Sequence, residues 1–156
     1  GCGSFIETFA KALGYNIGNS LLDADSIELA KKLMLDADAK GVKMLLPVDT
    51  VVAREFKADA EYMTVDSDRI PDGYMGMDIG EKTAKLFGEE IRKAGTVVWN
   101  GPMGVFEFDA FAKGTAAVAE ACAECKGTTI IGGGDSASAV KKLGYAERLL
   151  TTSDKA

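Results

Sequence analysis

Apolar residues recur at helical spacing in five parts of the chain. The repeat covers residues 4–13, 25–41, 83–93, 110–125 and 136–143, which predicts a helix in each. The first begins with Ser4-Phe5-Ile6-Glu7, the form of a capping box. Glycine stands at the end of four of these helices, at positions 14, 41, 95 and 144.

Short runs of β-forming residues lie between the helices. We expect strands at residues 42–49 ("VKMLLPVD"), 51–53, 96–99 and 128–131, and an edge strand at 61–66. The segment "SDRIPDGYMGMDIG" is rich in Gly, Asp and Pro, so we expect turns there. Strand and helix alternate with short connections, which indicates right-handed βαβ units. The expected fold class is α/β, a three-layer Rossmann-like open, mainly parallel sheet with helices on both faces.

Composition narrows the class of protein. The 156 residues are 47% hydrophobic and 27% charged, typical of one compact domain, so residues 1–156 are interpreted as a single domain. A net charge of −6 with dispersed Lys and Arg argues against a nucleic-acid partner. Nothing approaches the ~20 apolar residues that span a membrane, and no secretory signal is evident, so we expect a cytosolic protein.

Cysteine and histidine content limits the chemistry. The three cysteines indicate no disulfide framework, and the absence of histidine removes Ser-His and Cys-His catalysis. Cys122 and Cys125 have the spacing of a metal or redox pair, but their small apolar neighbours favour ordinary core residues.

A glycine-rich loop follows the last predicted strand. "TIIGGGDSASAV" leads through Gly132, Gly133 and Gly134 into a helix, where backbone N–H groups and the positive end of the helix dipole suit a phosphate. Asp135 is then either the N-cap of that helix or a metal holder. The alternative is a tight turn without a ligand. The loop lacks the G-x-G-x-x-G pattern, so a dinucleotide-dependent oxidoreductase is disfavoured.

A second loop follows residues 96–99 in "TVVWNGPMGVFEFDAF". Asn100 can bond a phosphate or sugar, Pro102 fixes the chain, Gly104 permits close approach, and Glu107 can accept hydrogen bonds from ribose hydroxyls. The loop reads as half of a nucleotide pocket. The alternative is a structural turn in which Trp99 and Phe106 pack in the core.

A third loop, "GMDIGEKT", resembles a P-loop but lacks the Lys directly after Gly. We interpret it as a turn and N-cap into the following helix. Asp78 facing the nucleotide site is the alternative.

Four motifs in this order, "LLPVD", "IPDGYMGMDIG", "TVVWNGPMGVFE" and "IIGGGDSASAVKKLG", resemble the nucleotide-binding C-terminal domain of the phosphoglycerate kinase family. The likeness runs from about Phe9 to about Glu147. The resemblance implies Mg²⁺ with ATP or ADP, and phosphoryl transfer between 1,3-bisphosphoglycerate and Mg-ADP that yields ATP and 3-phosphoglycerate.

The resemblance also implies roles for residues. Asn100 would contact phosphates, Glu107 would hold the ribose hydroxyls, Asp135 would hold Mg²⁺, and Ser136 would approach the phosphates. The residues expected to line the adenine and ribose pocket are Pro102, Gly104 and Val105. The opening glycine motif of the family is reduced here to Cys2-Gly3-Ser4-Phe5.

Parts of the family pattern are missing from this sequence. They are the phosphoglycerate-binding domain, a lysine-bearing segment at the transferring phosphate and a second glycine run. Since phosphoryl transfer depends on positioning and charge neutralisation, we expect no turnover by these residues alone. Two readings stay open: a partial nucleotide-binding domain, or a natural or engineered structural or interaction module that retains only the fold. A sheet edge left exposed by truncation would favour self-association.

Overall fold

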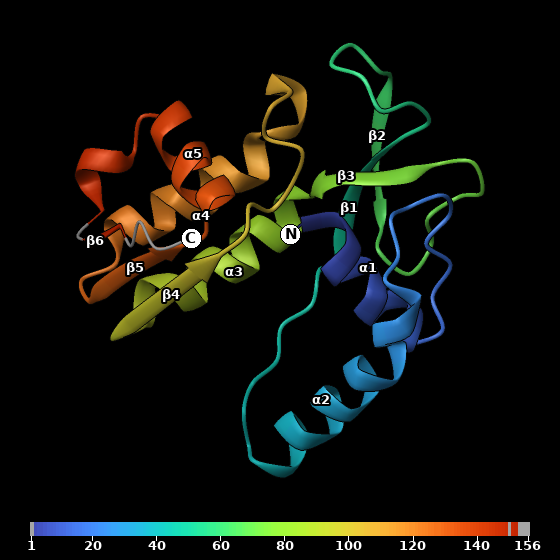
Figure 1. Ribbon diagram of the computed structural model, residues 1–156, viewed down its shortest axis with the longest axis horizontal. Helices are drawn as coiled ribbons and strands as arrows, with labels where there is room; N and C mark the ends of the chain where they lie inside the picture. The colour runs from blue at the N-terminus through green and yellow to red at the C-terminus, as the bar shows by residue number, and fades with distance from the viewer. Residues whose placement is uncertain (1, 150, 153–156) are drawn as a thin grey trace.

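The protein is described by a computed structural model that covers residues 2–149, 151 and 152 (Figure 1). The described residues form two β-sheets and a set of helices. The helices are α1 (Cys2–Ala12), α2 (Ile27–Ala39), α3 (Glu81–Lys93), α4 (Lys113–Glu124) and α5 (Gly134–Lys142). The strands are β1 (Asp49–Ala53), β2 (Tyr62–Asp66), β3 (Met75–Ile79), β4 (Thr96–Asn100), β5 (Thr128–Gly132) and β6 (Thr151–Thr152). Single-turn 3₁₀ helices cover Ala24–Ser26, Asp109–Phe111 and Ala146–Arg148.

All five predicted helices are present, with shifted ends. The first begins at Cys2, so Ser4 lies inside the helix and the predicted capping box is wrong. The fourth is preceded by a separate 3₁₀ turn, and its α-helix begins only at Lys113. Glycines 14, 41 and 144 follow helix ends with positive φ angles of 83°, 66° and 79°, which confirms the predicted stops.

The first sheet is antiparallel, with strand order β2-β1-β3. β2 is the predicted edge strand, and Val51 on β1 lies opposite Thr64 on β2 and Asp78 on β3. The turn-rich segment that precedes α3 therefore contains a strand that was not predicted. The glycines of this segment argued against a strand, because Gly is unfavourable in strand interiors. Gly76 is nevertheless part of β3, where the absence of a side chain lets the Glu7 carboxyl group lie directly beside its backbone.

The second sheet is parallel, with strand order β4-β5-β6. The predicted strand at 42–49 is wrong: residues 42–47 form no strand, and β1 begins only at Asp49. β3 instead returns antiparallel along β1. The α/β class is confirmed, but the described strands do not form one mainly parallel sheet, because β1 pairs only with antiparallel neighbours.

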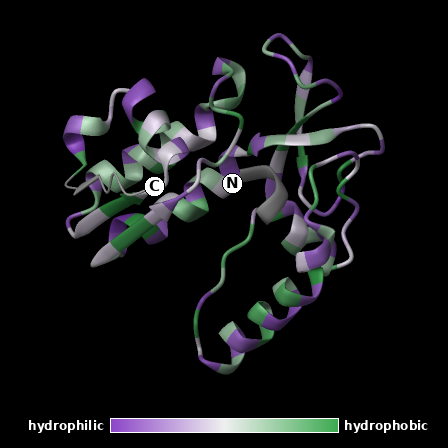
Figure 2. Ribbon diagram, viewed as in Figure 1, coloured by the Kyte–Doolittle hydropathy of each residue, from purple (hydrophilic) through white to green (hydrophobic). Residues whose placement is uncertain are grey.

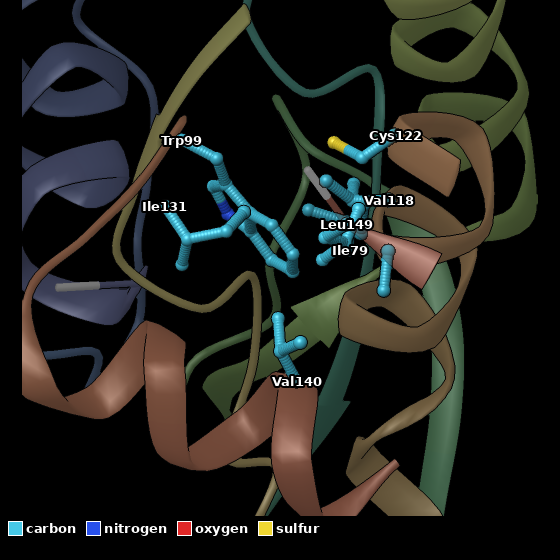
Figure 3. Packing of buried hydrophobic residues seen from close by; sticks show 8 residues of the cluster. Ile79, Trp99, Val118, Cys122, Ile131, Val140 and Leu149 are labelled. Atoms are coloured by element: carbon cyan, nitrogen blue, oxygen red, sulfur yellow. The ribbon is translucent and has the colours of Figure 1, made fainter. Parts of the chain in front are cut away.

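A buried apolar cluster packs between the parallel sheet and helices α4 and α5 (Figure 3). Trp99 on β4 and Ile131 on β5 meet Val118 and Cys122 on α4 and Val140 on α5. Ile79, at the end of β3, also joins the cluster, so the antiparallel sheet is anchored to the same core. This core fixes the ends of β4 and β5, from which the two candidate loops depart.

α2 projects from the rest of the molecule and packs on α1 (Figures 1 and 2). Ala30 is its single fully buried residue, while Leu29 and Leu35 are exposed. Across the residues that the structure describes, no helix combines the length and apolar character needed to cross a membrane.

Candidate functional site

The two predicted loops leave the parallel sheet side by side. Asn100, the last residue of β4, lies opposite Gly132, the last residue of β5. Because both strands run the same way, the loops "GPMGVFE" and "GGDS" begin at one edge of the sheet. The structure therefore brings together the two segments that the sequence singled out.

A direct hydrogen bond joins these loops. The backbone N–H of Gly101 donates to Oγ of Ser136 at 2.6 Å, and Ser136 is fully buried. The Trp99 indole N–H donates to the Gly101 carbonyl oxygen at 2.8 Å. Ser136 thus has a structural task, linking α5 to the turn after β4, that sequence reasoning did not anticipate.

The glycine loop has an open side. Gly133 is the N-cap of α5 with φ of +85°, and a Cβ there would lie 2.9 Å from Oδ1 of Asn100. Gly134 is exposed with open space around its missing side chain. The first N–H groups of α5 have no carbonyl partner inside the helix, so they suit an anion.

Asp135 is an exposed residue in the first turn of α5. The N-cap position belongs to Gly133, so the alternative reading of Asp135 as the N-cap is wrong. Its carboxylate lies one residue beyond the open backbone of Gly134. This position leaves it available for a cation that accompanies an anion bound at the glycine loop.

Hydrogen bonds to α4 and β3 hold the loop after β4 in place. Thr115 Oγ1 accepts hydrogen bonds from the N–H groups of Met103 at 3.0 Å and Gly104 at 3.4 Å, and the Val105 N–H donates to the Met77 carbonyl at 2.9 Å. A Cβ on Gly104 would lie 2.7 Å from that carbonyl oxygen and would collide with the Asp78 carboxylate. Gly104 is therefore explained by packing on β3.

Three further residues of this loop differ in exposure. Pro102 is buried, Val105 is half-buried, and Glu107 is exposed. Lys142 at the end of α5 donates hydrogen bonds to the carbonyl oxygens of Phe106 at 3.0 Å and Glu107 at 2.9 Å. Phe106 packs in the core, as one of the alternative readings held.

Asp78 is buried beneath the loop after β4. Its carboxylate accepts hydrogen bonds from the N–H groups of Ile79 at 2.9 Å and Gly114 at 2.8 Å. Burial raises the pKa of Asp78 to about 7, against these two hydrogen bonds and the nearby charge of Lys113, which lower it. Asp78 supports the loop from its buried side.

The predicted turn at "GMDIGEKT" is wrong, because residues 76–79 belong to β3 and α3 begins at Glu81. Gly80 of this segment is the N-cap of α3, as predicted, but the side chain that accepts hydrogen bonds from the first turn comes from elsewhere in the chain. The Asp49 carboxylate accepts hydrogen bonds from the N–H groups of Lys82 at 3.1 Å and Thr83 at 2.8 Å. Thr83 Oγ1 also bonds Asp49. Asp49 and the first turn of α3 are more than 30 positions apart, so sequence spacing could not show that they pair. The aspartate in the motif "LLPVD" was the one sequence feature that could have indicated this contact.

Cys122 and Cys125 are core residues. Both are buried free thiols, and burial together with the neighbouring Cys125 raises the pKa of Cys122 to about 11. Within the described residues, no group of three or more His, Cys, Asp or Glu side chains is placed to hold a metal ion. The burial of both side chains supports their interpretation as core residues.

Comparison with known proteins gives a consistent result. Residues 1–153 match the family model described as phosphoglycerate kinase. The phosphoglycerate kinase of Clostridium novyi is 58% identical over 147 residues, which is 94% of this chain and 37% of that protein. The tobacco protein named "Phosphoglycerate kinase, cytosolic" is 54% identical over 150 residues, with the same shares covered.

A solved structure agrees with the fold. The phosphoglycerate kinase of Coxiella burnetii superposes with a TM-score of 0.95 and 37% sequence identity, covering 98% of this chain and 39% of that one. The chain thus spans between a third and two fifths of the length of the relatives it matches. From the motifs, the fold and these matches together, the chain belongs to the phosphoglycerate kinase family.

Proposed function

We propose that residues 1–156 are a single nucleotide-binding portion of phosphoglycerate kinase that binds Mg-ADP or Mg-ATP at the adjoining loops after β4 and β5. The observation that carries the proposal is the juxtaposition of the loops. Asn100 lies opposite Gly132, and the Gly101 N–H bonds Ser136, so an anion at the glycine loop would have the other loop beside it.

Exposure divides the proposed site residues into two groups. Asn100, Glu107, Gly133, Gly134 and Asp135 are exposed and are proposed to contact the nucleotide or its cation. Asn100 would contact phosphates, Glu107 the ribose hydroxyls, and the glycine N–H groups the phosphate oxygens. The less exposed members of the site, which shape its wall, are Pro102, Gly104, Val105, Gly132 and Ser136.

Asp135 is proposed to hold Mg²⁺ together with the nucleotide. Mg²⁺ commonly keeps several waters and binds through one or two carboxylates plus substrate phosphates, so a single exposed carboxylate beside a phosphate-binding loop fits. The bound ion would neutralise phosphate charge. Asp135 itself would fix where that charge is neutralised relative to the start of α5.

Phosphoryl transfer is proposed for the protein at the length of its relatives, between 1,3-bisphosphoglycerate and Mg-ADP. Because the chain spans 37% of the curated relatives, binding without turnover is the activity proposed for these 156 residues. The name of the tobacco relative, together with the composition, supports a cytosolic location.

Thermal unfolding with Mg²⁺, ADP or both tests the proposal. A ligand that binds only the folded state stabilises it by ~2.7 kcal/mol at a hundredfold excess over Kd. We expect the melting temperature to rise with Mg-ADP, and Asp135→Ala to remove the part that requires Mg²⁺. Asp38→Ala on α2, also an exposed carboxylate, is the matched control and should respond like the original chain. No shift at millimolar Mg-ADP would refute the proposal.

A second candidate is an interaction module without a ligand. Among the described strands, β4 pairs only with β5, and Val98 on β4 is 69% exposed. A free edge with apolar side chains favours pairing with a second copy. Sedimentation would then show a concentration-dependent dimer that Val98→Lys abolishes, and Mg-ADP would not change the melting temperature.

A further inference from the structure

Lys142 connects the two ends of the proposed site through α5. Its ammonium group donates hydrogen bonds to the carbonyl oxygens of Phe106 at 3.0 Å and Glu107 at 2.9 Å. The same helix begins at Gly134 and carries Asp135 in its first turn. One nine-residue helix therefore holds the glycine loop at its start and the Glu107 loop at its end.

The backbone at residues 106–107 is held from two sides. On the buried side, the Phe106 ring packs with Ala112 and Ala139, and Leu143 lies against them. On the outer side, the Lys142 ammonium group engages the two carbonyl oxygens. The local turn adds the hydrogen bonds from the Phe106 N–H to the Gly104 carbonyl and from the Phe108 N–H to the Val105 carbonyl.

The carbonyl oxygens, rather than a carboxylate, are the principal partners of Lys142. Its ion pair with Asp109 is longer, at 3.5 Å, and the Asp109 side chain is 98% exposed. An ion pair at that exposure is strongly screened and contributes little. Two charge-assisted hydrogen bonds to adjacent carbonyls, in contrast, fix the direction of the backbone that carries Glu107.

We propose that Lys142 is a positioning residue that holds Glu107 in place for the ribose hydroxyls. The inference rests on the proposed function, because Glu107 matters only if a nucleotide binds. Lys142 acts through the loop and touches no ligand. Losing its hydrogen bonds lowers the fraction of chains with Glu107 in position, and apparent affinity falls by that fraction.

Calorimetric titration with Mg-ADP and with Mg-2′,3′-dideoxy-ADP tests the inference. Lys142→Met should weaken ADP binding about three- to tenfold and leave dideoxy-ADP within about twofold, because the second ligand offers Glu107 no hydroxyls. Lys142→Arg keeps the donors and should restore the preference. Lys141→Met removes the same charge from the neighbouring exposed position and should behave like the original chain, which controls for long-range attraction of the nucleotide.

The outcomes separate the inference from the proposed function. Equal weakening of both nucleotides by Lys142→Met, or no weakening, would overturn the positioning role while nucleotide binding stands. If the original chain binds ADP and dideoxy-ADP equally, the assignment of Glu107 to the ribose hydroxyls fails. If it binds neither, the assignment of nucleotide binding fails. Hydrogen exchange then tests directly whether Lys142 holds the backbone at residues 106–107. The Phe106 and Phe108 amides should exchange faster in Lys142→Met than in Lys141→Met, and equal rates would overturn the positioning role.

Discussion

Two regions of the molecule bury their apolar residues to different extents. In the region around the parallel sheet, formed by α3, β4, α4, β5 and α5, Ile131 is fully buried. In the α2 region, formed by α2 and residues 42–47, Leu35 is 71% exposed. The contrast teaches that an amphipathic pattern determines which residues can be buried, whereas the neighbouring elements determine which of them are.

Different forces hold the two regions. β4 and β5 pair along five residues each and are covered by the Trp99 cluster. α2 carries ion pairs within one turn, Lys31 with Glu28 at 2.8 Å and Lys32 with Asp36 at 2.5 Å. Such exposed pairs contribute only about 0.2–0.5 kcal/mol each. The region around the parallel sheet therefore contributes more to the free energy of folding than the α2 region.

The largest expected effect compares core and exposed truncations. Ile131→Ala should lower the free energy of unfolding by about 2–5 kcal/mol, because it leaves a cavity in the Trp99 cluster. Leu35→Ala removes comparable apolar volume from an exposed position and should change it by less than about 0.5 kcal/mol. Urea unfolding monitored by Trp99 fluorescence gives both values. Equal losses would show that α2 is buried in solution and would break the comparison.

A smaller effect is expected where the loop after β4 meets β3. Gly104→Ala should cost about 1–3 kcal/mol, because its Cβ would meet the Met77 carbonyl and the Asp78 carboxylate. Gly95→Ala is the matched control, since no atom lies within 4 Å of its Cβ. The same unfolding assay measures both. A Gly104→Ala variant as stable as Gly95→Ala would contradict the packing of this loop on β3.

A pH-dependent effect is expected where Glu7 of α1 and Asp78 of β3 line one small cavity with Met103. Burial raises the pKa of Glu7 from 4.5 to about 7. Between these two values the folded state holds a proton that the unfolded chain releases. The contribution of Glu7 to the free energy of unfolding is therefore fully present below about pH 4.5 and is lost as the pH rises through about 7.

Glu7→Gln should remove the contribution of Glu7 to this pH dependence, so its gain in the free energy of unfolding over the original chain should grow as the pH rises from about 4.5 to about 7. The pH dependence that comes from the raised pKa of Asp78 would remain. Glu61→Gln on the exposed surface is the control and should follow the original chain. Unfolding curves between pH 4 and 8 provide the test. Parallel pH profiles for Glu7→Gln and the original chain would show that Glu7 ionises freely in the folded state.

Local pattern predicted much of the region around the parallel sheet. Helical periodicity indicated α3 and α5, β-forming runs indicated β4 and β5, and the two candidate loops followed from their order. The same reasoning failed at residues 42–47, because an apolar run shows that a segment can be buried but not that a partner strand pairs with it. β3 was missed because its glycine is required by a distant carboxyl group, that of Glu7.

The sequence pattern did not predict the contacts between distant parts of the chain. Lys142 and the Glu107 carbonyl are 35 positions apart, as are Ser136 and the Gly101 N–H. The lysine reads as an ordinary residue of the last helical turn, and the serine as a polar residue after a glycine loop. Their positioning roles depend on how α5 packs against the loop after β4, which sequence spacing does not encode.

The most direct test of the account is a map of backbone amide chemical shifts during titration with Mg-ADP. The account predicts progressive shifts in the amides of residues 132–136 and of residues 100–107 except Pro102, with those of α2 and β2 unchanged. Shifts confined to α2 or β2, or none at millimolar ligand, would contradict the assignment of nucleotide binding to the loops after β4 and β5.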